Sequence, residues 1–150
     1  MKKFRFSLEK VLEIKEVEEK VIQKKLLLIQ NEIIETEKKI ISNREKISVE
    51  RKKISLLSEN IINSMEIMIH YKYIDGLTSE IESLQENLKR LKLQEFQIKK
   101  ELIEKSKEKK ALEKLKEIKF EEFKKDYNRA QQMFIDDISI QSHRFKVGSV

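Results

Sequence analysis

The sequence predicts an all-α protein, a long antiparallel two-helix coiled-coil hairpin, and two observations support this. An apolar residue recurs every seven positions along much of the chain, and such a repeat keeps one side of a helix against a partner helix. The 150 residues also include no proline and only two glycines, while 40% are charged. A globular domain with many short elements would need more turn residues. We therefore expect a single domain over residues 1–150, with short flexible ends.

The first helix is expected at about residues 8–58, with Ser7 as its N-cap. Its main seven-residue series is broken only at Glu19, and its apolar members are Leu12, Leu26, Ile33, Ile40, Ile47, Ile54 and Ile61. The companion series carries polar residues at three successive positions, Thr36, Asn43 and Glu50. One polar residue in such a seam can fix the register at a cost in stability. Three in succession predict that the helices pair less stably in this middle region.

The second helix is expected at about residues 64–142. Nine of ten positions in its two series are apolar, with Glu95 as the exception: Ile67, Ile74, Ile81, Leu88, Leu102, Leu77, Leu84, Leu91 and Ile98. The step from Ile61 to Ile67 is six residues instead of seven, which places a turn near residues 58–64. Asp75-Gly76 is a stronger turn dipeptide, so a turn at 75–78 is the alternative. The apolar series runs through Gly76, which favours the earlier turn.

The apolar pattern weakens after Leu102, because Lys105 and Lys109 occupy positions related to the seam. An aromatic stripe at 3–4 spacing follows, formed by Phe120, Phe123, Tyr127, Ala130 and Phe134. Two interpretations of the stripe remain open. It is either core that packs against the N-terminal residues or a docking face, because an overhanging helix has little of its own chain to cover four aromatic rings.

A second group of aromatic residues lies near the expected turn, where His70 stands beside Tyr71 and Tyr73. These residues either pack within the helix pair or form a recognition patch with Ile69 and Leu77. Tyrosine and histidine suit a recognition patch because each combines an apolar body with a polar edge.

The composition argues against several classes of function. Two distant glycines cannot form a phosphate-binding loop, and His70 and His143 have no neighbours at metal-ligand spacing, so we expect no enzyme activity, no cofactor and no metal. There is no cysteine, and we expect no secretory signal, because Glu9 and Lys10 interrupt any apolar run after the basic start. The longest apolar run, Leu26 to Ile29, is far too short to span a bilayer. The net charge of +6 is spread among interspersed acids and bases, which is typical of a solvated helix surface.

Three segments together resemble the FliJ family, a coiled-coil component of the flagellar type III export machinery. Residues 4–16, FRFSLEKVLEIKE, are similar to the amino-terminal pattern of spaced Phe and Leu in that family. Residues 70–77, HYKYIDGL, are similar to an aromatic patch early in its second helix. Residues 136–140, DDISI, are similar to a carboxy-terminal pattern of an acidic pair followed by apolar residues.

The resemblance implies a protein shaped like the central stalk of a rotary ATPase, which works in the cytoplasm at the inner-membrane base of the flagellum and serves motility. Its joined termini would insert into the hexameric flagellar export ATPase, its hairpin region would contact the membrane export-gate protein, and it would escort export chaperones. By position, the residues contacting the ATPase ring would be Phe4, Phe6, Leu8, Leu12, Asp136, Asp137 and Ile138. The residues contacting the export gate would be Tyr73, Ile74 and Leu77. The basic stretch 99–125 could steer the protein toward acidic pore loops.

Two other classes of function compete with the stalk. The heptads alone would also suit a generic coiled-coil spacer or a dimer of single long helices, which sedimentation would reveal. The sequence pI of about 9.3 suggests, less strongly, a nucleic-acid-binding rod, for which binding should fall steeply with salt. We expect no nucleic-acid partner and no direct insertion into the membrane.

Overall fold

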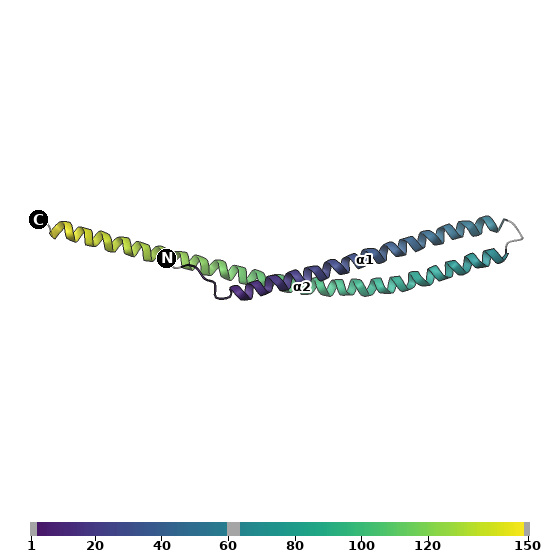
Figure 1. Cartoon of the computed structure of the whole chain (residues 1–150), viewed down its shortest axis with the longest axis horizontal. Helices are drawn as coiled ribbons and strands as arrows, with labels where there is room; N and C mark the ends of the chain where they lie inside the picture. The colour runs from purple at the N-terminus through teal and green to yellow at the C-terminus, as the bar shows by residue number, and fades with distance from the viewer. Residues whose placement is uncertain (1–2, 60–63, 149–150) are drawn as a thin grey trace. The chain divides into compact units, whose positions relative to one another are not determined.

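The computed structural model describes residues 3–59 and 64–148, which form two helices and no strand. Helix α1 spans Glu9–Leu57 and helix α2 spans Ser64–Gly148 (Figure 1). The all-α fold with two long helices packed against each other is therefore confirmed. So is the turn near residues 58–64, of which residues 60–63 lie outside the described part. The alternative turn at 75–78 is wrong, because α2 is helical through both residues of the Asp75-Gly76 dipeptide.

Helix α1 lies within one residue of its expected bounds at each end, and helix α2 extends further than expected at its C-terminal end. The backbone N–H of Leu12 donates to the carbonyl of Leu8 over 3.0 Å, so Leu8 occupies the cap position that was expected for Ser7. Helix α2 ends at Gly148 instead of near 142. No proline interrupts this last stretch, and Lys146 in the final turn complements the negative end of the helix dipole.

The chain divides into two compact units. The hairpin unit comprises Lys20–Ile103, and the terminal unit comprises Met1–Glu19 together with Glu104–Val150. In each unit a part of α1 packs antiparallel against a part of α2. That the whole chain acts as a single domain, as the sequence suggests, stays a prediction.

The core of the hairpin unit follows the two heptad series. Its buried cluster takes three isoleucines from α1 and three residues from α2: Ile40, Ile47, Ile54, Ile74, Leu77 and Ile81. Ile67, Leu84 and Leu88 are partly buried against this cluster. The seven-residue spacing places one apolar side chain per two turns in the seam, and each contributes about 1.5–3 kcal/mol through burial.

The three polar residues of the companion series are buried in the same seam, at 6–8% exposure. The hydroxyl of Thr36 donates to the carbonyl of Glu32 over 2.8 Å. Glu50 hydrogen-bonds His70 of α2, and this bond lowers the pKa of the Glu50 carboxyl. The amide nitrogen of Asn43 has no hydrogen-bond partner within residues 3–59 and 64–148. The seam therefore contains polar layers, one of which leaves a buried donor unpaired.

Candidate functional site

Charged side chains hold the two helices of the terminal unit together where the apolar seam ends. Four lysine–glutamate pairs cross between α1 and α2, at N–O distances of 2.9–3.3 Å: Lys15–Glu108, Lys105–Glu18, Lys109–Glu19 and Lys116–Glu9. Lys105 and Lys109, which interrupt the apolar pattern in the sequence, therefore have carboxylate partners on the other helix. Glu19, the break in the first series, is one of those partners.

These contacts shift the pKa values of the paired groups. A hydrogen bond from Lys105 lowers the pKa of Glu18, and a hydrogen bond from Lys15 lowers the pKa of Glu108. The same bond raises the pKa of Lys15. Partly exposed ion pairs of this kind contribute little individually and are weakened by salt. The helix pairing in the terminal unit should therefore respond to pH and ionic strength more than the isoleucine seam of the hairpin unit does.

Residues 3–8 precede α1 and place aromatic side chains on α2. The ring of Phe4 lies 5.2 Å from the Phe120 ring and 5.7 Å from the Phe123 ring, measured between centroids. Tyr127 stacks on Phe123 at 6.3 Å, and the ammonium group of Lys124 lies 4.8 Å from the centre of the Phe120 ring. The first part of the aromatic stripe therefore packs against the N-terminal residues, but it is not buried core, because Phe120 remains 39% exposed and Phe123 and Tyr127 are half-buried.

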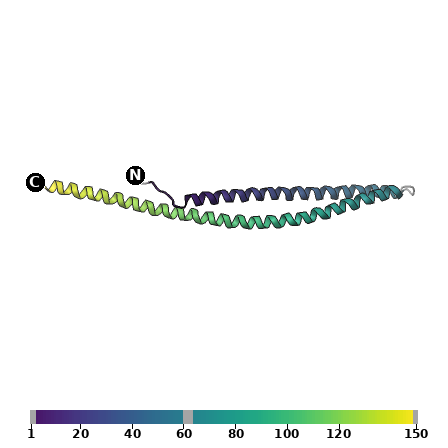
Figure 2. The ribbon, with the colours of Figure 1, turned by 60° about the horizontal axis from the view of Figure 1, so that its bottom comes forward.

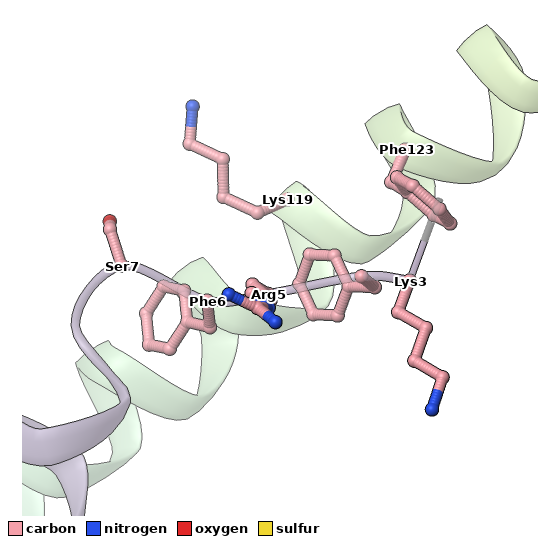
Figure 3. A pocket seen from close by; sticks show the side chains of 7 residues that line it. Lys3, Arg5, Phe6, Ser7, Lys119 and Phe123 are labelled. Atoms are coloured by element: carbon pink, nitrogen blue, oxygen red, sulfur yellow. The ribbon is translucent and has the colours of Figure 1, made fainter. Parts of the chain in front are cut away.

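The N-terminal segment and α2 also line an open pocket of about 640 Å³. Figure 3 shows Phe6 and Phe123 along its wall, with the side chains of Lys3 and Lys119 pointing away on opposite sides of the segment. Arg5 adds a third cation, and no carboxylate lines the pocket. This end of the terminal unit thus combines aromatic surface with positive charge.

Helix α2 continues past the N-terminal residues, and no other described segment of its unit lies beside its C-terminal end (Figure 2). Every residue from 128 to 148 is exposed. One side of this helix continues the aromatic stripe through Ala130, Phe134, Ile138 and Phe145, whose three large side chains are 66%, 50% and 81% exposed. A row of large apolar side chains in water is typical of a surface that binds a partner. For this C-terminal part the second interpretation, a docking face, stays a prediction that its exposure supports.

The residues expected to contact the ATPase ring are distributed over two places. Phe6 and Leu12 are buried, Leu8 is half-buried, and Phe4 packs on the aromatic rings of α2. Asp136, Asp137 and Ile138 are exposed, and Asp136 accepts a hydrogen bond from Gln132 over 3.0 Å. At the helical rise of about 1.5 Å per residue, position 136 lies roughly 20 Å along α2 from Phe123. The structure does not join these residues into one patch.

Of the three residues expected to contact the export gate, two are buried and one is exposed. Ile74 and Leu77 are 7% and 6% exposed within the isoleucine cluster, whereas Tyr73 is 47% exposed. While the helices remain packed, only Tyr73 of the three offers its side chain to a partner. His70 is half-buried beside Glu50, as expected for a packing residue.

Several exposed apolar residues lie outside the expected contact sets, although Ile69 belongs to the alternative recognition patch around His70. Phe145 follows Ile138 by seven residues, so extending the stripe by one more heptad would have found it. Near the start of α2, Met65, Met68 and Ile69 are 82%, 61% and 65% exposed. Met65 and Ile69 precede Tyr73 by eight and four residues and share one side of α2 with it, whereas Met68, five residues before Tyr73, lies on another side. The sequence could have indicated these residues, because they are apolar positions of α2 that fall outside the heptad series and are therefore not expected in the seam.

Two further properties bear on function. No helix within residues 3–59 and 64–148 is long and apolar enough to cross a membrane. The same residues contain no group of three or more side chains that could hold a metal ion.

The paired helices, their polar seam layers and the uncovered apolar face define a coiled-coil protein with exposed apolar surface. The model of the flagellar FliJ protein family matches residues 4–147, and the chain belongs to that family. It is therefore a structural component of the flagellar export apparatus. Neither the curated proteins nor the solved structures that were compared include a match to the chain.

Proposed function

We propose that this protein is the central stalk of the flagellar export ATPase ring, that it links the ring to the membrane export gate, and that it escorts export chaperones. It would act by binding and not by catalysis, in the cytoplasm at the inner-membrane base of the flagellum. The observation that carries the proposal is the uncovered apolar stripe of α2, which combines Phe134, Ile138 and Phe145 on one side of an unpaired helix. Family membership supplies the setting in which this surface would find a hexameric ring.

The burial of the residues at the ATPase end suggests which of them would contact the ring directly and which would act indirectly. Phe4, Phe6 and Leu12 would act indirectly, because they fix the N-terminal segment on α2. The direct contacts would come from the exposed stripe and from the neighbouring carboxylates of Asp136 and Asp137. The cations around Phe4 would favour an acidic surface inside the ring.

A matched pair of variants tests the ATPase contact. Phe134→Ala with Ile138→Ala removes two stripe residues of 66% and 50% exposure, whereas Met133→Ala with Ile140→Ala removes two of 68% and 52% exposure from another side of the same helix. We expect the first variant to lose binding to the cognate flagellar ATPase and the second to retain it, when both are measured by fluorescence anisotropy. Equal affinity of the two variants would contradict the assignment of the stripe.

The export-gate contact would lie on the face that Tyr73 shares with Met65 and Ile69, and the buried side chains of Ile74 and Leu77 would hold this face in place. The flexible side chain of Met65 can adapt to different partners, which would suit a protein that also handles several chaperones. Tyr73→Ala should weaken binding to the cytoplasmic part of the gate protein. Tyr71→Ala is the control, because Tyr71 is 53% exposed on a different side of α2. A larger loss with the control would show that the face is misplaced.

A further inference from the structure

The hairpin unit carries a shallow groove between α1 and α2 that is lined by three cations and no carboxylate. Arg44, Arg51 and Lys52 supply the positive charge. None of the three forms an ion pair with another residue of the described chain, whereas the neighbouring Lys53 pairs with Glu50 at 3.4 Å. Unpaired arginines have their full set of N–H donors available for an anionic partner.

The groove is short, and acids bound it in the sequence. Glu37 stands one heptad before Arg44 on the same line of α1, and its carboxylate pairs with Lys92 of α2 at 3.8 Å. Glu59 follows the last lining residue of α1, Ser55. The part of α1 that lines the groove, from Arg44 to Ser55, is about 16 Å long at the rise of an α-helix, and Glu45 and Glu50 within this range do not line the groove. This length fits about three turns of a helix and does not offer the extended track of charge that a nucleic-acid strand uses.

The spacing of the arginines matches that of a third helix in the groove. Arg44 and Arg51 are one heptad apart, which corresponds to about 10 Å along α1. Two carboxylates one heptad apart on a neighbouring helix have the same spacing, whichever way that helix runs. Arginine forms paired, nearly planar hydrogen bonds with a carboxylate, so each arginine can hold one acid.

The remaining lining residues suit close approach of a helix. Ser48 and Ser55 are small side chains that alternate with the arginines along α1, and Thr78 faces them from α2. The Thr78 hydroxyl already donates to the carbonyl of Ile74 over 2.9 Å, which leaves its oxygen as an acceptor. The floor is formed by Ile47 and Ile81, the edges of the apolar seam. A partner helix would thus find apolar contact at the bottom and positive charge on the α1 side.

We propose that this groove binds an acidic amphipathic helix of a partner protein, with two carboxylates one heptad apart paired to Arg44 and Arg51. The inference does not depend on the stalk function, because it concerns a different unit and a different surface. A binding site of this kind would give the hairpin unit selectivity for partners with a defined spacing of acids.

The test uses the full chain and a synthetic stapled helical peptide that carries two glutamates one heptad apart beside an apolar stripe. Binding is measured by fluorescence anisotropy, with a peptide of the same composition in scrambled order for comparison. Arg44→Glu with Arg51→Glu should weaken binding at least about tenfold, because two charge-assisted pairs become repulsive. Lys39→Glu with Lys46→Glu is the matched control, since both lysines are exposed, one heptad apart, and on another side of α1. We expect the control to change affinity less than about twofold.

A charge-swapped peptide with lysines in place of the two glutamates should bind the Arg44→Glu, Arg51→Glu variant better than it binds the unmodified protein. Arg44→Gln with Arg51→Gln provides a milder variant if charge reversal lowers helicity in circular dichroism. Equal losses of affinity in the groove and control variants would overturn the proposal, because binding would then depend on the overall positive charge and not on the groove. No binding of the first peptide to the unmodified protein would also overturn it. Tighter, arginine-dependent binding of a single-stranded oligonucleotide would assign the groove to nucleic acid instead.

Discussion

Replacing Asn43 by leucine should stabilise the hairpin unit. Asn43 is 6% exposed in the α1 seam, and its amide nitrogen has no partner among the residues that the structure describes. A buried donor without a partner costs about 1–3 kcal/mol. Leucine has the same branching at Cγ but is larger than asparagine, and it would contribute about 1.5–3 kcal/mol by burial. Imperfect packing in a site shaped for asparagine reduces the sum by about 1 kcal/mol or more. We expect a net increase of about 2–4 kcal/mol in the free energy of unfolding.

Urea unfolding followed by far-ultraviolet circular dichroism at pH 7 measures this change. Thr36→Val is the control, because Thr36 is also buried but its hydroxyl already has a partner in the Glu32 carbonyl. The control should change stability by less than about 1 kcal/mol. Sedimentation of the Asn43→Leu variant checks its oligomeric state, since a polar seam residue can fix register. An unchanged or lowered unfolding free energy for a variant of normal helicity would show that the amide is satisfied by another group.

Three further changes should have defined effects on stability. The lowered pKa values of Glu18 and Glu108 mean that their ion pairs stabilise the fold fully above the ordinary value of 4.5 and lose this effect as the pH falls through the lowered values. Urea midpoints should therefore decrease below pH 4.5, and a constant midpoint from pH 6 to pH 3 would contradict the pairing. Gly76→Ala should add about 1 kcal/mol, because the position is helical and a Cβ there meets nothing within 4 Å; thermal melting that shows a loss would refute this. Leu77→Ala should cost about 2–5 kcal/mol and Tyr73→Ala less than about 1 kcal/mol. Similar losses in urea unfolding would be inconsistent with their difference in burial.

The seam of the hairpin unit was predictable because burial follows the seven-residue period. Ile40, Ile47 and Ile54 lie in the core where the heptads place them, and the phase break before Ile67 located the turn. The competing Asp75-Gly76 dipeptide failed because a helical glycine costs only about 1 kcal/mol, less than the burial of the flanking Ile74 and Leu77 contributes. Local turn preference was outweighed by packing.

Other features depend on the register between the helices, which neither helix specifies alone. Lys105 and Lys109 looked like defects in an apolar pattern, yet each faces a glutamate of α1. Periodicity also could not show which part of the aromatic stripe is covered by the N-terminal segment. Phe120 and Phe134 share one side of α2, but Phe4 contacts only Phe120 of the two. The assignment of Ile74 and Leu77 to a contact surface came from a family pattern that residues packing in the seam satisfy equally well.

The stalk proposal is tested most directly by the rate of ATP hydrolysis of the cognate flagellar ATPase with and without this protein. We expect the protein to stimulate hydrolysis. Deletion of residues 1–7 should remove the stimulation, because it removes Phe4 from the Phe120 and Phe123 rings. The Phe134→Ala, Ile138→Ala variant should also lose it, while Met133→Ala with Ile140→Ala should keep it. Unchanged hydrolysis, with no binding of the unmodified protein to the ring, would contradict the stalk function.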